Sequence, residues 1–298
     1  MSLKTETRLL VADDWEDYAL LDSGHLQKLE RFASQTVIRP DPQAFWEPAR
    51  PVQSWKADAR FVTKAQDEDG AGQWEVLSAR AAENWPMRWN GLTFTARRTA
   101  FRHMGVFQEH SVHWRFAQDQ IRAAKRPLKV LNLFGYTGMM SLACAAAGAE
   151  VVHLDASPKS NGYGKDNQTL SGLEDRTIRW IADDAMKFVA REIRRGSRYD
   201  AIVLDPPKFG RGPKNETWRF EESLPELLDG VQSLLSEAPQ FVILTAYAVR
   251  LSYLAVAQAL GDRLAPYGGV MEMGEMALPQ QGSDRLLPTA LYARWRAA

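Results

Sequence analysis

From residue 128 onward, apolar runs of strand length alternate with segments of helical character, and this rhythm constrains the fold more than any other feature. Strands that alternate with helices form right-handed βαβ units, in which a parallel sheet is covered by helices on both faces. Glycines and capping residues mark where many of the helices begin or end. Strands are expected at 128–134, 150–156, 177–182, 199–204 and 241–246, and helices at 138–147, 157–171, 185–195, 224–235 and 252–264.

The end of the chain departs from this rhythm. Two further strands are expected at 269–276 and 289–295, and the link 278–288 between them contains two prolines and a glycine. No helix fits in this link, so the last two strands should pair antiparallel. Residues 116–298 are therefore predicted to form an α/β domain with a doubly wound, mostly parallel sheet of seven strands.

Residues 1–115 have a different character, in which tryptophans, prolines and short β-like runs dominate. Turn signals occur at 39–42 and 69–72. Short strands are expected at 18–21, 36–38, 74–77 and 92–96. We expect this part to form a separate β-rich domain that caps the α/β domain or holds the substrate.

Charge and cysteine content exclude several classes of protein. The 298 residues carry 37 Lys and Arg against 37 Asp and Glu, and this balance argues against a polybasic nucleic-acid coat. The one cysteine, Cys144, excludes a disulfide framework and a cysteine-rich metal site. No apolar run of about 18 residues predicts a membrane helix, and the first residues lack the apolar core of a signal peptide. A cytoplasmic location is expected.

Polar or glycine-rich segments follow four predicted strands, at the edge of the sheet where open α/β folds bind ligands. They are Gly135, Thr137 and Gly138 after the first strand, Asp155 after the second, Asp183 and Asp184 after the third, and Asp205-Pro206-Pro207 after the fourth. Each also has a purely structural interpretation: turn glycines, the start of a helix, or a capping residue such as Thr137, Asp183 or Asp184. Their occurrence together, in the expected order, predicts a nucleoside-binding edge.

The glycine spacing distinguishes between cofactors. A nicotinamide-binding fold should open its first helix with G-x-G-x-x-G, whose glycines receive a pyrophosphate. This chain has Gly-Tyr-Thr-Gly-Met-Met at 135–140 instead. A ligand without phosphate does not need the closely spaced glycines, and S-adenosylmethionine is such a ligand.

With these motifs the chain resembles the class I S-adenosylmethionine-dependent methyltransferases, which have a Rossmann-like fold. The resemblance is carried by 130–138, Asp155, Asp183, 205–209 and the terminal hairpin. Leu-Asn-x-Phe-x-Tyr-Thr-Gly and Asp-Pro-Pro-Lys-Phe are similar to the branch related to bacterial 23S rRNA cytosine-5 methyltransferases. Segments 18–46, 105–109 and 209–214 resemble a bacterial methyltransferase subgroup, so the resemblance covers nearly the whole chain.

The resemblance implies S-adenosylmethionine as cofactor and a role for each matching residue. Gly135, Thr137 and Gly138 should line its methionine end, Asp155 should hold the ribose and Asp183 the adenine amino group. Asn132 stands where an acidic residue is common, so its contact is expected to be weaker or water-mediated. Phe107 and Glu109 resemble a lid over the cofactor. The complete expected set is Phe107, Glu109, Asn132, Phe134, Gly135, Thr137, Gly138, Asp155, Ala156, Asp183 and Asp184.

The expected catalytic group is the turn Asp205-Pro206-Pro207-Lys208. Methyl transfer from a sulfonium requires an aligned nucleophile, exclusion of water and one proton transfer, and it needs no metal. A similar turn positions the amine in amino-group methyltransferases, although an aromatic residue there takes the place of Lys208. His103, His110 and His113 lack the H-E-x-x-H arrangement, so no metal site is expected.

Cysteine-dependent carbon methylation is not expected. The cytosine-5 enzymes that the Asp-Pro-Pro-Lys form resembles need a nucleophilic cysteine after the fifth strand. This chain has Leu-Thr-Ala-Tyr at 244–247. Cys144 lies among alanines in the first predicted helix, where packing is the favoured role.

Two basic stretches bear on the acceptor. One comprises Lys208, Arg211, Lys214 and Arg219, and the other Arg191, Arg194, Arg195 and Arg198. For the first stretch, contact with substrate phosphates is the favoured interpretation. For the second stretch, substrate contact and a solvated helix face are equally favoured. RNA, with ribosomal RNA favoured, is the expected acceptor. A protein or small-molecule acceptor, a nicotinamide-dependent oxidoreductase and a non-catalytic RNA module remain alternatives. The sequence predicts neither the methylated atom nor the oligomeric state.

Overall fold

The computed structural model describes residues 3–63 and 72–298, so most of the expected turn at 69–72 lies outside the described residues. The chain forms two compact units, each assembled from separate segments. We call Met1–Leu10, Val112–Met276 and Ala290–Ala298 the α/β unit, and Val11–Ser111 with Ala277–Thr289 the β-rich unit.

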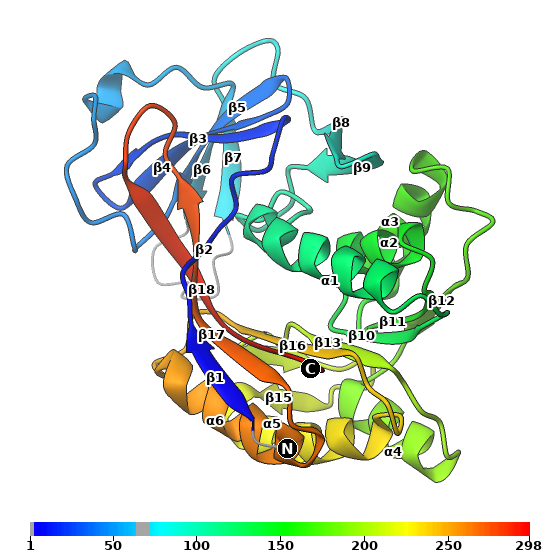
Figure 1. The fold of residues 1–298 in the computed structure, drawn as a ribbon. Helices are drawn as coiled ribbons and strands as arrows, with labels where there is room; N and C mark the ends of the chain where they lie inside the picture. The colour runs from blue at the N-terminus through cyan, green and yellow to red at the C-terminus, as the bar shows by residue number, and fades with distance from the viewer. Residues whose placement is uncertain (1–2, 64–71) are drawn as a thin grey trace. The chain divides into compact units, whose positions relative to one another are not determined.

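The main sheet of the chain has nine strands (Figure 1). They are β1 (Lys4–Thr7), β2 (Leu10–Val11), β10 (Lys129–Leu133), β11 (Glu150–Asp155), β12 (Ile178–Ala182), β13 (Ala201–Leu204), β16 (Phe241–Ala246), β17 (Val270–Pro279) and β18 (Leu286–Arg296). Their order is β1-β17-β18-β16-β13-β10-β11-β12, and β2 also pairs with β17. All of the predicted strands of the α/β domain are therefore present.

The strand directions confirm the predicted fold class. Strands β12, β11, β10, β13 and β16 pair in parallel, whereas β18 pairs antiparallel to β16. Every residue of β13 and β16 is buried, as expected for parallel strands covered on both faces. Strand β1 lies parallel to β17 at the edge of the sheet and was not predicted. Its Lys-Thr-Glu-Thr sequence is polar and mostly exposed, so no apolar pattern identifies it.

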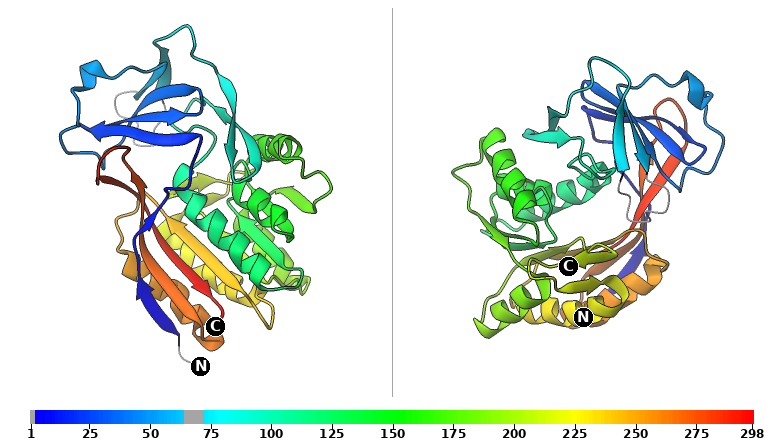
Figure 2. Two further views of the ribbon diagram at one scale, coloured as in Figure 1. Left: turned by 45° about the horizontal axis from the view of Figure 1, so that its top comes forward. Right: turned by 180° about the vertical axis from the view of Figure 1, so that it is seen from behind.

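Helices cover both faces of this sheet (Figures 1 and 2). On one face lie α1 (Ser111–Ala123), α2 (Met139–Ala146) and α3 (Pro158–Leu170), and on the other α4 (Ala185–Arg194), α5 (Phe220–Leu234) and α6 (Tyr253–Leu264). The side chains of Ser157, Asp184 and Ser252 accept backbone N–H groups and thereby cap α3, α4 and α6. The short helix η3 (Ala265–Tyr267) follows α6. No described helix is long and apolar enough to cross a membrane.

The first basic stretch forms a small hairpin between β13 and α5. Strands β14 (Phe209–Arg211) and β15 (Thr217–Arg219) pair antiparallel, with Gly210 opposite Trp218. The helix that follows begins at Phe220, one turn earlier than the expected start at 224. It contains Pro225, which removes one helical hydrogen bond. Phe220 is nevertheless fully buried, and its packing supports the extra turn.

The β-rich unit contains a five-stranded sheet and a separate hairpin. The sheet runs β3 (Tyr18–Gly24), β4 (Gln27–Phe32), β5 (Gln35–Pro40), β6 (Ala59–Thr63) and β7 (Gly72–Val76), and the hairpin is β8 (Asn84–Trp89) with β9 (Leu92–Arg97). The four predicted strands correspond to β3, β5, β7 and β9, whereas β4, β6 and β8 were not predicted. Two short helices, η1 (Val52–Ser54) and η2 (Gln108–His110), complete this unit.

The observed units differ from a simple division after residue 115. The turn between β17 and β18 joins the β-rich unit, because the backbone N–H of Gln281 donates to the Leu20 carbonyl at 2.8 Å. Conversely, β1 joins the α/β unit through its pairing with β17. Each unit is thus held together by hydrogen bonds between segments that are distant in sequence.

Candidate functional site

The turn after β10 is fixed to the end of β11 at two points. The Gly135 N–H donates to the Leu154 carbonyl at 2.9 Å, and the Tyr136 N–H donates to Asp155 Oδ2 at 2.8 Å. Phe134 and Tyr136 have left-handed φ values of 58° and 50°. The turn therefore keeps an unusual backbone shape at the carboxyl end of the strands, where open α/β sheets bind ligands.

The two glycines of this turn pack against side chains from the neighbouring strands. A Cβ on Gly135 would lie 2.3 Å from Cε1 of His153, and one on Gly138 would lie 2.6 Å from Cη2 of Trp180. Gly138 also has a φ of 88°, which a larger residue would adopt only with strain. Protein packing alone thus requires glycine at both positions, so the glycines are not by themselves evidence of a ligand.

Asp155 retains capacity to bind a ligand. Its Oδ1 accepts the Ser157 N–H at 2.8 Å and its Oδ2 accepts the Tyr136 N–H at 2.8 Å. A carboxylate offers about four lone-pair positions, so about two remain for further donors. The carboxyl is half-buried, and burial raises its pKa while the two N–H donors act in the opposite direction. Two ribose hydroxyls would fill the remaining positions.

Two other predicted cofactor residues are engaged within the protein. Asn132 is 2% exposed and donates from Nδ2 to Ser141 Oγ at 2.9 Å. The Thr137 carbonyl accepts a hydrogen bond from Asn167 Nδ2 at 3.1 Å. Gly138, and not Thr137 as expected, occupies the N-cap position of α2.

The adjacent aspartates after β12 have different partners. Asp183 Oδ2 forms an ion pair with Nη1 of Arg191 at 2.6 Å, which the sequence reading did not identify. Asp184 accepts the Lys187 N–H at 3.0 Å and is the N-cap of α4, as its alternative interpretation proposed. Recognition of an adenine amino group by Asp183 would therefore share its carboxylate with Arg191.

The turn after β13 is held by the β14–β15 hairpin. The Pro207 carbonyl accepts Trp218 Nε1–H at 2.6 Å, and the Lys208 carbonyl accepts the Phe220 N–H at 3.0 Å. Trp218 is buried, and its ring centre lies 5.0 Å from that of Phe134 in the cofactor turn. This tryptophan links two predicted parts of the site and was not predicted from the sequence. Asp205 is half-buried, Pro206 is buried, and Lys208 is exposed.

The basic residues divide into paired and unpaired groups. Arg191, Arg195 and Arg219 form ion pairs with Asp183, Glu192 and Glu222, respectively. By contrast, Lys208, Arg211 and Lys214 have no carboxylate partner within the described residues. The Arg211 guanidinium carbon lies 5.7 Å from the ring centre of Phe209, which is 46% exposed. The hairpin thus presents free cations beside an exposed aromatic ring.

The remaining candidate residues lie elsewhere. Phe107 and Glu109 belong to the β-rich unit, so their role as a lid remains a prediction. Burial, together with Arg39, Arg102 and Lys28, lowers the pKa of His103 to about 3. No group of three His, Cys, Asp or Glu side chains within 3–63 and 72–298 is arranged to hold a metal.

Cys144 is buried in α2, where burial raises the pKa of its thiol to about 12. Its Sγ–H donates to Sδ of Met140 at 3.8 Å. A buried thiol with a raised pKa is a poor nucleophile, in agreement with the packing role expected for this residue.

Known proteins resemble this chain at several levels. A family model described as S-adenosylmethionine-dependent methyltransferase matches residues 33–249. Ribosomal RNA large subunit methyltransferase K/L of Shewanella frigidimarina is 29% identical over 180 residues, covering 59% of this chain and 24% of the relative. Ribosomal RNA large subunit methyltransferase I of Aeromonas salmonicida is 38% identical over 96 residues, covering 32% of this chain and 24% of the relative. The chain thus spans about a quarter of the length of these relatives.

A solved structure extends the similarity to the whole chain. The crystal structure of a SAM-dependent methyltransferase from Agrobacterium tumefaciens is 44% identical and superposes with a TM-score of 0.94. The match covers 100% of this chain and 96% of that chain.

Proposed function

This chain belongs to the S-adenosylmethionine-dependent methyltransferase family, and from that premise we propose that it methylates RNA, with ribosomal RNA as the favoured acceptor. Family membership supplies the reaction class and the cofactor, both of which agree with the prediction from the sequence. It also argues against the alternative of a nicotinamide-dependent oxidoreductase.

The observation that carries the RNA proposal is the β14–β15 hairpin. Lys208, Arg211 and Lys214 are exposed cations without carboxylate partners among the described residues. Lys208 follows directly on the Asp-Pro-Pro turn, and Arg211 and Lys214 lie further along the hairpin. Phe209, between two of them, is 46% exposed. Cations bind phosphates and exposed aromatic rings stack on bases, so the hairpin combines the two features that single-stranded RNA requires. The names of the relatives from Shewanella and Aeromonas point to the same acceptor class.

The cofactor supplies an electrophilic methyl group on a sulfonium, and the residues of the chain orient the reactants. In the proposed site, Asp155 uses its remaining lone pairs to hold the ribose hydroxyls. Asp205 then accepts a hydrogen bond from the acceptor group, and Lys208 holds a neighbouring phosphate or helps to manage the departing proton. With RNA as the acceptor, we propose that the protein acts in the cytoplasm.

Lys208→Ala tests the role of the hairpin. We expect nearly unchanged S-adenosylmethionine affinity by calorimetry, and a single-turnover methyl-transfer rate lowered by about tenfold or more. Arg219→Ala is the matched control, because this arginine lies on the same hairpin but is paired with Glu222 at 3.4 Å. It should change the rate by less than about twofold. Wild-type transfer and wild-type RNA binding by Lys208→Ala would overturn the role of Lys208.

The acceptor itself is identified by mass spectrometry of RNA from cells with and without the gene. We expect one modified nucleotide to be present only with the gene, and RNA from the deleted cells to accept a labelled methyl group from the purified protein. Label that enters protein or a small molecule instead of RNA would refute the RNA acceptor and leave the methyltransferase assignment intact.

A further inference from the structure

Three polar or aromatic side chains form a row across the sheet, next to the turn at 134–138. Asn132 on β10 is the register partner of His153 on β11, and His153 is the register partner of Trp180 on β12. Register partners in parallel strands direct their side chains to the same face of the sheet. His153 is fully buried and Asn132 is 2% exposed. Polar groups buried in apolar strands destabilise a fold unless they form hydrogen bonds, so their presence here needs an explanation.

A hydrogen-bonded chain connects two of these residues to α2. Asn132 Nδ2 donates to Ser141 Oγ at 2.9 Å, and Ser141 Oγ forms a second hydrogen bond with Nδ1 of His153, also at 2.9 Å. His153 Nε2 is buried and has no hydrogen-bond partner among the described residues. Burial lowers the pKa of His153 to about 3, so the ring is neutral at physiological pH.

The ring fills the space directly under the turn. A Cβ on Gly135 would lie 2.3 Å from its Cε1 and 2.6 Å from its Nδ1, and the ring centre of Trp180 lies 4.4 Å from its own. The Tyr136 backbone and the Asn161 side chain are close enough to raise the pKa of the ring against the larger effect of burial. Tyr136 in turn donates its N–H to Asp155. His153 therefore contacts the backbone segment that orients the proposed ribose ligand.

We infer that His153 is a positioning residue for S-adenosylmethionine, and that the chain Asn132–Ser141–His153 sets the shape of the 134–138 turn. His153 acts through the turn and does not touch the cofactor. Asn132, expected from the sequence to contact the cofactor, belongs to this supporting chain. The inference rests on the proposed cofactor site at 134–138 and Asp155.

His153→Ala tests the inference, with cofactor affinity measured by calorimetry. We expect the affinity for S-adenosylmethionine to fall about tenfold or more, because the turn loses its support and the Ser141 hydroxyl loses a hydrogen-bond partner. Added imidazole should occupy the cavity and restore part of the affinity. Val152→Ala is the matched control, since Val152 is 2% exposed on the same strand but points to the opposite face. It should lower the unfolding temperature and change the affinity by less than about twofold.

Ser141→Ala supports the test if His153→Ala does not fold, because it removes one hydroxyl and leaves the ring in place. We expect an affinity loss of about threefold or more. Equal affinity losses in His153→Ala and Val152→Ala, or wild-type affinity in Ser141→Ala, would overturn the positioning role. Asp155→Ala, measured in parallel, separates the two levels of inference. Wild-type binding by Asp155→Ala refutes the cofactor site itself, whereas its loss together with intact binding by His153→Ala refutes only the role of His153.

Discussion

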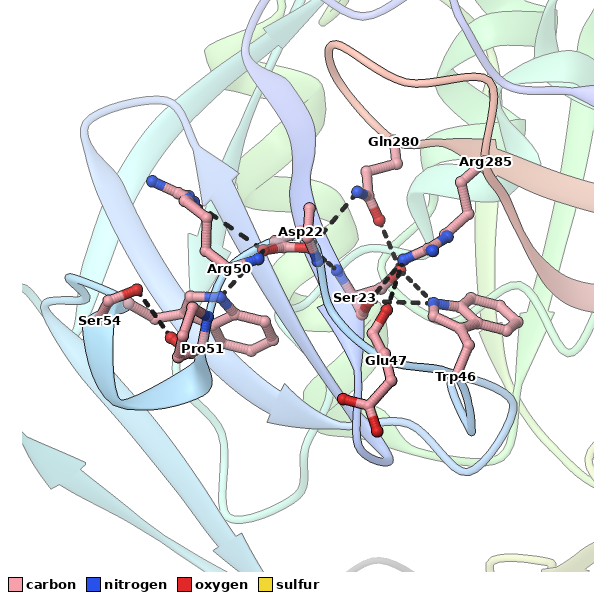
Figure 3. Close-up of polar contacts among 11 residues, drawn as sticks. Asp22, Ser23, Trp46, Glu47, Arg50, Pro51, Ser54, Gln280 and Arg285 are labelled. Carbon is pink, nitrogen blue, oxygen red and sulfur yellow. Dashed lines mark hydrogen bonds and ion pairs between the residues drawn. The ribbon is translucent and has the colours of Figure 1, made fainter.

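Asp22 in the β-rich unit and Asp155 in the α/β unit both accept backbone N–H groups on both carboxylate oxygens, yet their remaining surroundings differ. Asp22 is fully buried, and Figure 3 shows the polar contacts around its carboxylate. Its donors are the N–H groups of Ser23, Ala49 and Arg50, Trp55 Nε1 and Gln280 Nε2, at 2.9–3.3 Å. Five donors exceed the roughly four lone-pair positions of a carboxylate, so Asp22 has no capacity for a ligand.

The contrast indicates how to distinguish a structural carboxylate from one that binds ligand. Asp22 joins the segment 49–55 and the 277–289 turn to β3, whereas Asp155 accepts only two N–H donors and is half-buried. Glu30 resembles Asp22: it is fully buried, receives two hydrogen bonds from Arg39 at 2.6 and 2.7 Å, and accepts Tyr18 Oη–H at 2.9 Å. A carboxylate whose lone pairs are all occupied by donors from the protein stabilises the fold. A carboxylate at a strand end that keeps unoccupied lone pairs can bind a ligand.

The largest effect is expected for Arg39→Met, which removes both charge-assisted hydrogen bonds from Arg39 to the buried Glu30 and leaves Lys28 Nζ, 3.6 Å from Oε1, as its remaining ion-pair partner. The unfolding free energy of the β-rich unit should fall by about 3–5 kcal/mol, as is usual when one partner of a buried pair is removed. Denaturant unfolding followed by tryptophan fluorescence measures this change. Arg219→Met, at an exposed pair, should cost less than about 0.5 kcal/mol. A similar loss in both variants would contradict the structural role of the Glu30–Arg39 pair.

Asp22→Ala should destabilise the β-rich unit by about 2–3 kcal/mol, because buried N–H donors lose their acceptor. Its S-adenosylmethionine affinity should stay within about twofold of wild type, since Asp22 has no free lone pair to offer. Calorimetry and denaturant unfolding of the same preparation measure both quantities. If Asp22→Ala lost S-adenosylmethionine affinity but kept its stability, the assignment of Asp22 as a structural carboxylate would be wrong.

Asp155→Ala should show the opposite pattern. Loss of two charge-assisted hydrogen bonds should weaken cofactor binding by about 1.5–3 kcal/mol, and the unfolding free energy should change by less than about 1 kcal/mol. Burial raises the pKa of this carboxyl, so wild-type affinity should fall on acidification at a higher pH than an ordinary aspartate would cause. The affinity of Asp155→Ala should not show this fall on acidification. If a folded Asp155→Ala variant bound S-adenosylmethionine with unchanged affinity, Asp155 would not belong to the site.

The sequence predicted those elements whose signal is local. Strands buried on both faces are continuous apolar runs, so β13 and β16 were predicted at nearly their observed bounds. The polar β1 carries no such signal, because its partner β17 lies near the other end of the chain. The mixed aromatic and polar sequence of α1 was likewise missed.

The candidate site follows the same rule. The strand-end position of Asp155 was readable from its neighbours, whereas the Arg191 partner of Asp183 and the bond from Trp218 to Pro207 depend on tertiary structure. His153 and Asn132 did leave a signal: each interrupts an otherwise apolar strand. A polar residue in such a run, paired in register with another, can indicate a buried network.

Each unit is built from segments that are distant in sequence, and this has a consequence for synthesis on the ribosome. Strand β1 is translated long before β17, the strand beside which it lies. The Leu20 carbonyl likewise has no access to its donor, the N–H of Gln281, until that residue has been made. Strands β3 to β9 can pair with one another early, but β1 must remain without its partner until β17 has been made. We therefore expect the nascent chain to depend on chaperones until β17 and the turn after it have left the ribosome.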